Sequence, residues 1–128
     1  MFTIIIIQTC IIIITGLGNL QVLFKNRKEE MDAAFLLYER KVRQQTEKTF
    51  KREWVDNKEF RGNECHLDHL LSIKECFENQ VPVEFAAHEC NLQIVSKEYN
   101  QRKGTKSSIT VSELYERITE RESDILGL

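Results

Sequence analysis

Four polar residues between positions 68 and 100 have the types needed to hydrolyse a phosphodiester bond: Asp68, His69, Asn91 and Asn100. This reaction calls for a cation that neutralises charge on the phosphate and a base that activates water. A carboxylate and an amide carbonyl are hard oxygen ligands, which favour Mg²⁺ or Mn²⁺ over Zn²⁺. Asp68 and Asn100 are therefore candidate metal ligands. Histidine ordinarily titrates near neutral pH, so His69 is the candidate general base.

Two short strands are predicted to position these residues. Apolar residues alternate loosely from Cys65 to Ile73 and recur from Leu92 to Val95, with a long irregular connection predicted from Glu75 to Ala87. Neighbouring side chains of a regular strand point to opposite faces. Asp68 and His69 can therefore serve one site only if the first strand ends or bends at this pair.

Three helices are predicted from apolar spacing and capping signals. Lys28 to Arg52 forms the first, with one apolar face made by Met31, Phe35, Tyr38 and Val42. Ser96 is a suitable N-cap for a second helix over 97–103, with Gly104 after its end. A capping box of Thr110 and Glu113 starts a third helix, which runs to about Glu122.

The stretch from Glu64 to Ser107 resembles the HNH nuclease motif and is most similar to the compact phage-encoded HNH homing endonucleases. The resemblance covers about the last seventy residues, including a similar tail from Ile109 to Ile118. It implies an α+β fold, in which a ββα-metal (HNH) core follows a long N-terminal helix and precedes a C-terminal helix. The matching pieces are Leu67-Asp68-His69, Phe77-x-Asn79-x-Val81-Pro82, His88-x-x-Asn91-Leu92, and Asn100 followed by Lys103-Gly104.

The resemblance also implies a role for each of these residues. His69 would be the catalytic base, Asn91 would orient its ring, and Asp68 and Asn100 would hold Mg²⁺ or Mn²⁺. Asparagine at position 100, where the family often has histidine, makes Zn²⁺ the less suitable metal. Contacts with nucleic acid are implied for Lys103, and on weaker grounds for Arg102, Lys106 and His88. For His88, a structural hydrogen bond between loop and core is an equal alternative.

The implied activity is that of a metal-dependent DNA endonuclease of homing or nicking type. A compact site of this kind cuts one strand, so cleavage of both strands would need a homodimer or two successive nicks. The alternatives are a module that binds nucleic acid without cutting it, and a small membrane-associated interaction protein built on the Ile-rich N-terminus. The net charge of −2 conceals two basic segments, Lys25–Arg52 and Lys97–Lys106, which a polyanion would meet first.

Composition predicts one domain with appendages, divided into an Ile-rich segment (1–20), a helical and partly basic region (21–60) and a nuclease domain (61–128). The two isoleucine runs before Gly16 favour strands, because β-branched residues pack well in sheets. The apolar run is shorter than the ~20 residues of a spanning helix, so membrane association is not expected. No secretion signal is evident, which predicts a cytoplasmic protein with reduced cysteines, Cys65 and Cys90 being buried.

Overall fold

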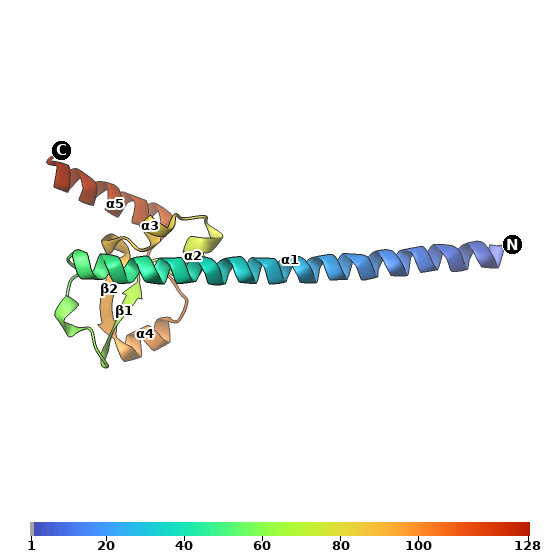
Figure 1. The fold of residues 1–128 in the computed structure, drawn as a ribbon, viewed down its shortest axis with the longest axis horizontal. Helices are drawn as coiled ribbons and strands as arrows, with labels where there is room; N and C mark the ends of the chain where they lie inside the picture. The colour runs from blue at the N-terminus through green and yellow to red at the C-terminus, as the bar shows by residue number, and fades with distance from the viewer. Residues whose placement is uncertain (1) are drawn as a thin grey trace. The chain divides into compact units, whose positions relative to one another are not determined.

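The computed structural model describes the backbone of residues 2–128 and the side chains of residues 16–128. The fold is α+β, with a long N-terminal helix, an antiparallel strand pair followed by a helix, and a C-terminal helix (Figure 1). The elements in chain order are α1 (Phe2–Arg52), η1 (Lys58–Phe60), β1 (Cys65–His69), α2 (Ile73–Glu78), α3 (Val83–Ala86), η2 (Glu89–Asn91), β2 (Leu92–Ser96), α4 (Lys97–Lys103) and α5 (Val111–Leu126).

Contacts group the chain into two units, Met1–Ala34 and Phe35–Leu128. The division falls inside α1, which continues through residue 20 and ends at Arg52.

The strands predicted for the Ile-rich segment are wrong, because α1 begins at Phe2 and runs through it. The preference of isoleucine for strands is weak and depends on a partner strand that covers its backbone groups. An α-helix satisfies those groups within the segment itself. Gly16 and Gly18 lie inside α1, each at a cost of about 1 kcal/mol relative to alanine, and do not end it.

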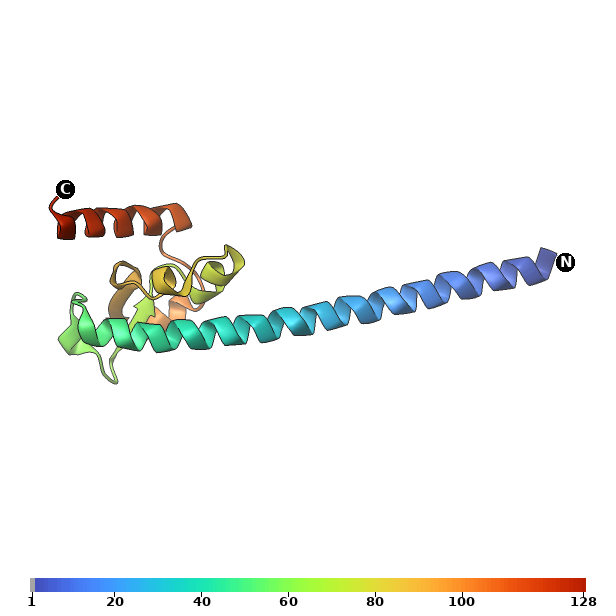
Figure 2. The same ribbon diagram turned by 45° about the horizontal axis from the view of Figure 1, so that its top comes forward.

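The second unit is built around the pairing of β1 with β2. The strands are antiparallel, with Asp68 opposite Gln93 and His69 opposite Leu92. Figure 2 shows the short helices that connect the strands, in yellow, between α5 and the part of α1 in this unit. The first strand ends at His69, four residues before the predicted Ile73. Its early end meets the condition under which Asp68 and His69 can serve one site.

The connection between the strands is helical, which corrects the predicted irregular loop. Ser72 caps α2 by accepting a hydrogen bond from the backbone of Glu75, and Pro82 stands at the N-cap of α3. Apolar side chains of these short helices pack inward, including Cys76 and Ala86, which have no exposed surface. Their brevity hides the helical period in the sequence, because a helix of one or two turns shows too few repeats.

The core of the second unit lies between α1, the interstrand helices and α5. From α1 it takes Val42, fully buried, with Phe35 and Tyr38 packed at its edge. Tyr38 also donates a hydrogen bond of 2.6 Å to the carbonyl of Val81. Met31, predicted on the same face, belongs to the first unit and is exposed. The remaining core residues are Leu71, Ile73, Cys76, Val81, Ala86, Ala87, Ile109, Leu114 and Ile118.

The two helices after β2 confirm their predicted caps. Ser96 accepts from the backbone of Tyr99 at the start of α4. Both hydrogen bonds of the capping box between Thr110 and Glu113 are present at the start of α5, which continues to Leu126. Among the described cysteines, Cys76 is the buried one, whereas Cys65 and Cys90 are partly exposed, and all three are free. Within the described part of the chain, no helix is long and apolar enough to cross a membrane.

Candidate active site

One cleft in the second unit collects four of the eight predicted site residues. Its volume is about 340 Å³, and β1, α2, α4 and the Phe35–Arg43 stretch of α1 contribute to its walls. Leu67, Asp68 and His69 come from β1, and Asn100 and Lys103 from α4. The other lining residues are Phe35, Glu39, Arg43, Ser72, Ile73, Lys74, Gly104 and Thr105.

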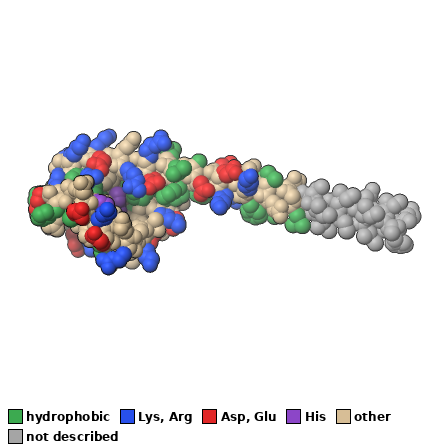
Figure 3. All heavy atoms as spheres, turned by 90° about the horizontal axis from the view of Figure 1, so that it is seen from below, with side chains coloured by type: hydrophobic (Ala, Val, Ile, Leu, Met, Phe, Trp, Pro, Cys, Tyr) green, Lys and Arg blue, Asp and Glu red, His purple; other side chains and the backbone are tan. Residues whose placement is uncertain are grey.

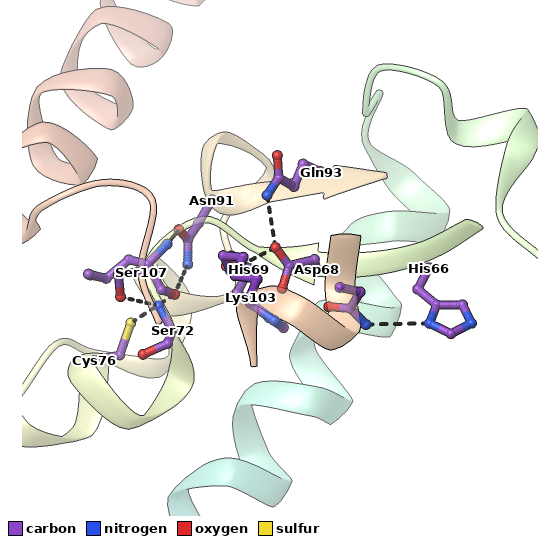
Figure 4. A network of polar contacts seen from close by, with 11 residues as sticks. His66, Asp68, His69, Ser72, Cys76, Asn91, Gln93, Lys103 and Ser107 are labelled. Carbon is purple, nitrogen blue, oxygen red and sulfur yellow. Dashed lines mark hydrogen bonds and ion pairs between the residues drawn. The ribbon is translucent and has the colours of Figure 1, made fainter. Parts of the chain in front are cut away.

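Asp68 lies at the centre of a buried polar network. Its Oδ2 accepts hydrogen bonds of 2.8 Å from Gln93 Nε2, on the opposite strand, and from Lys103 Nζ on α4 (Figure 4). Lys103 Nζ also donates to the carbonyl oxygen of His69, at 2.6 Å. The side chains of Lys103 and Asp68 are 6% and 10% exposed, so this ion pair is nearly withdrawn from water. Such a pair is costly to break from one side, because the remaining charge stays buried alone.

His69 is held by the side chain of a buried threonine on α1. The distance between Thr46 Oγ1 and His69 Nε2 is 2.9 Å, and Thr46 is 3% exposed. Burial, opposed by the carboxylate of Asp68 and assisted by the cations of Arg43 and Lys103, lowers the pKa of His69 to about 4. The imidazole is therefore neutral at physiological pH, and one ring nitrogen has a free lone pair.

Asn91, which was predicted to orient the His69 ring, holds the loop after β1 through its side-chain hydrogen bonds. Its Oδ1 accepts from the backbone N–H of Leu71 at 2.7 Å, and its Nδ2 donates to the carbonyls of Leu71 and Ala86. The side chain is fully buried. These three contacts satisfy the amide, so Asn91 supports the site by fixing the chain that follows His69.

Asn100 stands on α4 at the wall of the cleft, as predicted. Its Nδ2 lies 3.4 Å from His66 Nδ1, so the amide nitrogen faces the start of β1 (Figure 4). The carbonyl oxygen of the same amide is then the atom left for a cation. Asp68 and Asn100 thus bring two hard oxygen groups to the cleft from neighbouring elements.

The residues predicted to contact nucleic acid differ in their surroundings. Lys103 points inward to Asp68, so its ammonium is not displayed to solvent. Arg102 and Lys106 are exposed near the end of α4. His88 caps η2 by accepting from the backbone N–H of Cys90, which is the structural alternative for that residue. Figure 3 shows a histidine surface on this face of the second unit, with both basic and acidic side chains around it.

Two residues that matter for the geometry were not predicted. Thr46 holds His69, and Gln93 holds Asp68. The sequence offers no signal for Thr46, because the helical pattern of α1 does not show which strand will pack on it. Gln93 could have been found from the strand register, since it pairs directly with Asp68.

Comparison with known proteins gives no match. No family model, no curated protein and no solved structure matches this chain. Among the described residues, no group of three or more His, Cys, Asp or Glu side chains could hold a metal ion. A metal ion held by Asp68 and Asn100 would therefore depend on water and substrate oxygens for its remaining ligands.

Proposed function

We propose that this protein is a metal-dependent DNA endonuclease of the HNH type. The observation that carries the proposal is the convergence of Asp68, His69, Asn100 and Lys103 on one cleft, from a strand pair and the helix that follows it. An order of carboxylate, histidine and amide along a strand–strand–helix unit is what the resemblance in the sequence implies. The proposal belongs to the second unit alone.

The ligands present suit Mg²⁺ or Mn²⁺. Mg²⁺ in enzymes commonly takes one or two protein oxygens and completes its shell with water and substrate phosphate. Asp68 and Asn100 meet this requirement and would hold the ion. When bound, it would polarise the scissile phosphate and stabilise the leaving oxygen.

His69 would accept the proton of the attacking water. The hydroxyl of a helical threonine can donate to a carbonyl one turn earlier in its own helix. We therefore assign the Nε2–H of His69 as donor to Thr46 Oγ1, which leaves Nδ1 as the proton acceptor. A base with a pKa of about 4 is unprotonated throughout the neutral range but weaker than an ordinary histidine.

Phosphate contacts would come from exposed cations around the cleft. Lys74 lines it and is exposed, and Arg102 and Lys106 are exposed on the neighbouring α4 and the loop after it. Lys103 instead neutralises Asp68, so its contribution to phosphate binding is a charge inside the cleft and not a surface contact. Backbone contacts of this kind position DNA without reading its sequence.

A second candidate function is a module that binds nucleic acid without cutting it. The observation that favours it is the buried ion pair between Lys103 and Asp68, since the ammonium already neutralises the carboxylate that a metal would need. The two functions differ in whether a divalent ion displaces this contact.

Relaxation of supercoiled plasmid separates these functions. The purified chain is incubated with Mg²⁺, with Mn²⁺ or with EDTA, and binding of the same DNA is measured in parallel by fluorescence anisotropy. The endonuclease predicts nicked plasmid with either ion and none with EDTA. DNA binding without nicking in both ions would support the binding module and reject the endonuclease.

A further inference from the structure

One side of α1 in the first unit carries a regular repeat of exposed residues. Leu20, Leu23, Arg27, Glu30 and Ala34 follow one another at alternating steps of three and four. Leu20 and Leu23 are 50% and 65% exposed. This is the spacing of the contact face of a two-stranded coiled coil. Figure 3 shows hydrophobic side chains open to solvent along this part of the helix.

The repeat also borders a shallow groove along α1. Leu20, Leu23, Phe24, Arg27 and Glu30 line it, so apolar and charged groups share one surface. The ion pairs of the described residues include neither Arg27 nor Glu30. Two opposite charges in the middle of an apolar face therefore lack a partner of opposite sign within the described chain.

At the centre of this face, a block of basic residues is followed directly by a block of acidic residues. Residues 25–28 include three bases, and residues 29–32 include three acids. A second copy running antiparallel, with its centre between positions 28 and 29, sets each basic block against an acidic block. A parallel copy in register sets like charges against each other, which is unfavourable. The residues are Lys25, Arg27 and Lys28 in the first block, and Glu29, Glu30 and Asp32 in the second.

The same antiparallel register matches the residues of the repeat in pairs. It places Arg27 of each copy opposite Glu30 of the other, and Leu23 opposite Ala34. Leu20 comes opposite position 37, which is the next position of the repeat and is a leucine. A large side chain thus meets a small one beside the ion pairs, and leucine meets leucine at each end.

We propose that residues 20–37 of α1 bind the same segment of a second copy of this chain in an antiparallel coiled coil. Two Arg27–Glu30 ion pairs between the copies set the orientation and register. A polar pair inside such an interface specifies the pairing more than it strengthens it. A lipid surface is the less suitable partner, because Arg27 and Glu30 interrupt the apolar face.

The test is the dissociation constant of the full chain, measured by sedimentation equilibrium. Arg27→Glu alone and Glu30→Arg alone each create two like-charge contacts, and each is expected to raise the dissociation constant about tenfold or more. The double variant and an equimolar mixture of the two single variants recover opposite charges. Both are expected to return to within about threefold of the native value.

Lys48→Glu is the matched control, because it makes the same charge change at an exposed position of α1 outside residues 20–37, and it is expected to leave dimerisation nearly unchanged. Helix content by circular dichroism confirms that each variant is folded. A native chain that stays monomeric would overturn the proposal, including one that sediments with anionic lipid vesicles instead. Dimerisation of both single variants as tight as that of the native chain would also overturn it, because a parallel pair has like charges at positions 27 and 30 in the native chain and in either single variant.

Discussion

Lowering the pH from 7 to 5 is expected to destabilise this protein through His69. The pKa of the imidazole falls from the usual 6.5 to about 4 in the folded chain, because burial penalises its charged form. Between these values the unfolded chain binds a proton that the folded chain does not bind. Stability is therefore fully present above pH 6.5 and is lost as the pH falls toward 4.

The size of this effect follows from the two pKa values. At pH 7 both states are mostly neutral, whereas at pH 5 the unfolded imidazole is almost fully protonated and the folded one is not. At about 1.4 kcal/mol per pKa unit, the free energy of unfolding should decrease by about 2 kcal/mol between pH 7 and pH 5 through this group.

The assay is urea unfolding at pH 7 and pH 5, for the native chain and for His69→Gln. Glutamine keeps a polar group near Thr46 but does not titrate, so the difference between the two proteins isolates the imidazole from the carboxylates. The native chain should lose about 2 kcal/mol more than the variant. Equal losses in the two proteins would refute the burial of a neutral His69.

Three substitutions test other contacts of the site. Asn91→Leu removes the amide that bonds to Leu71 and Ala86, so the free energy of unfolding in urea should fall by about 3–5 kcal/mol. A fall of less than about 1 kcal/mol would contradict the anchoring role. Lys103→Met leaves Asp68 buried without its cation and should cost a similar ~3–5 kcal/mol, which the added change Asp68→Leu should largely restore. Thr46→Val should slow plasmid nicking roughly tenfold, whereas Thr46→Ser keeps the hydroxyl and should nick at about the native rate. Equal nicking rates for the two variants would show that the Thr46 hydroxyl has no part in the mechanism.

The elements around the site could be predicted from sequence because local signals define them. Ser96, Thr110 and Glu113 are caps whose hydrogen bonds involve residues close in sequence, and the structure has all of them. The Ile-rich segment could not be predicted in this way. Isoleucine favours a strand only where a neighbouring strand can pair with it, and the rest of the chain determines whether such a strand is present.

The residues of the candidate site were easier to predict than the side chains that contact them. Asp68, His69 and Asn100 were expected to meet, and they line one cleft. Lys103 was expected to contact nucleic acid, but its ion pair with Asp68 was not predicted. The pair forms because a helical side chain one turn beyond Asn100 reaches the strand beneath it. Such contacts depend on how α4 packs on β1, which the spacing of residues does not specify.

In the proposed reaction, His69 activates water for the metal-dependent cleavage of DNA. The most direct test of this role is the rate of plasmid nicking in Mg²⁺ by His69→Ala, compared with the native chain and with His88→Asn. Asparagine retains an acceptor for the cap of η2, so the second variant controls for loss of a histidine outside the cleft. We predict a fall of about 10²-fold or more for His69→Ala and a near-native rate for His88→Asn. Nicking by His69→Ala at the native rate would contradict the account.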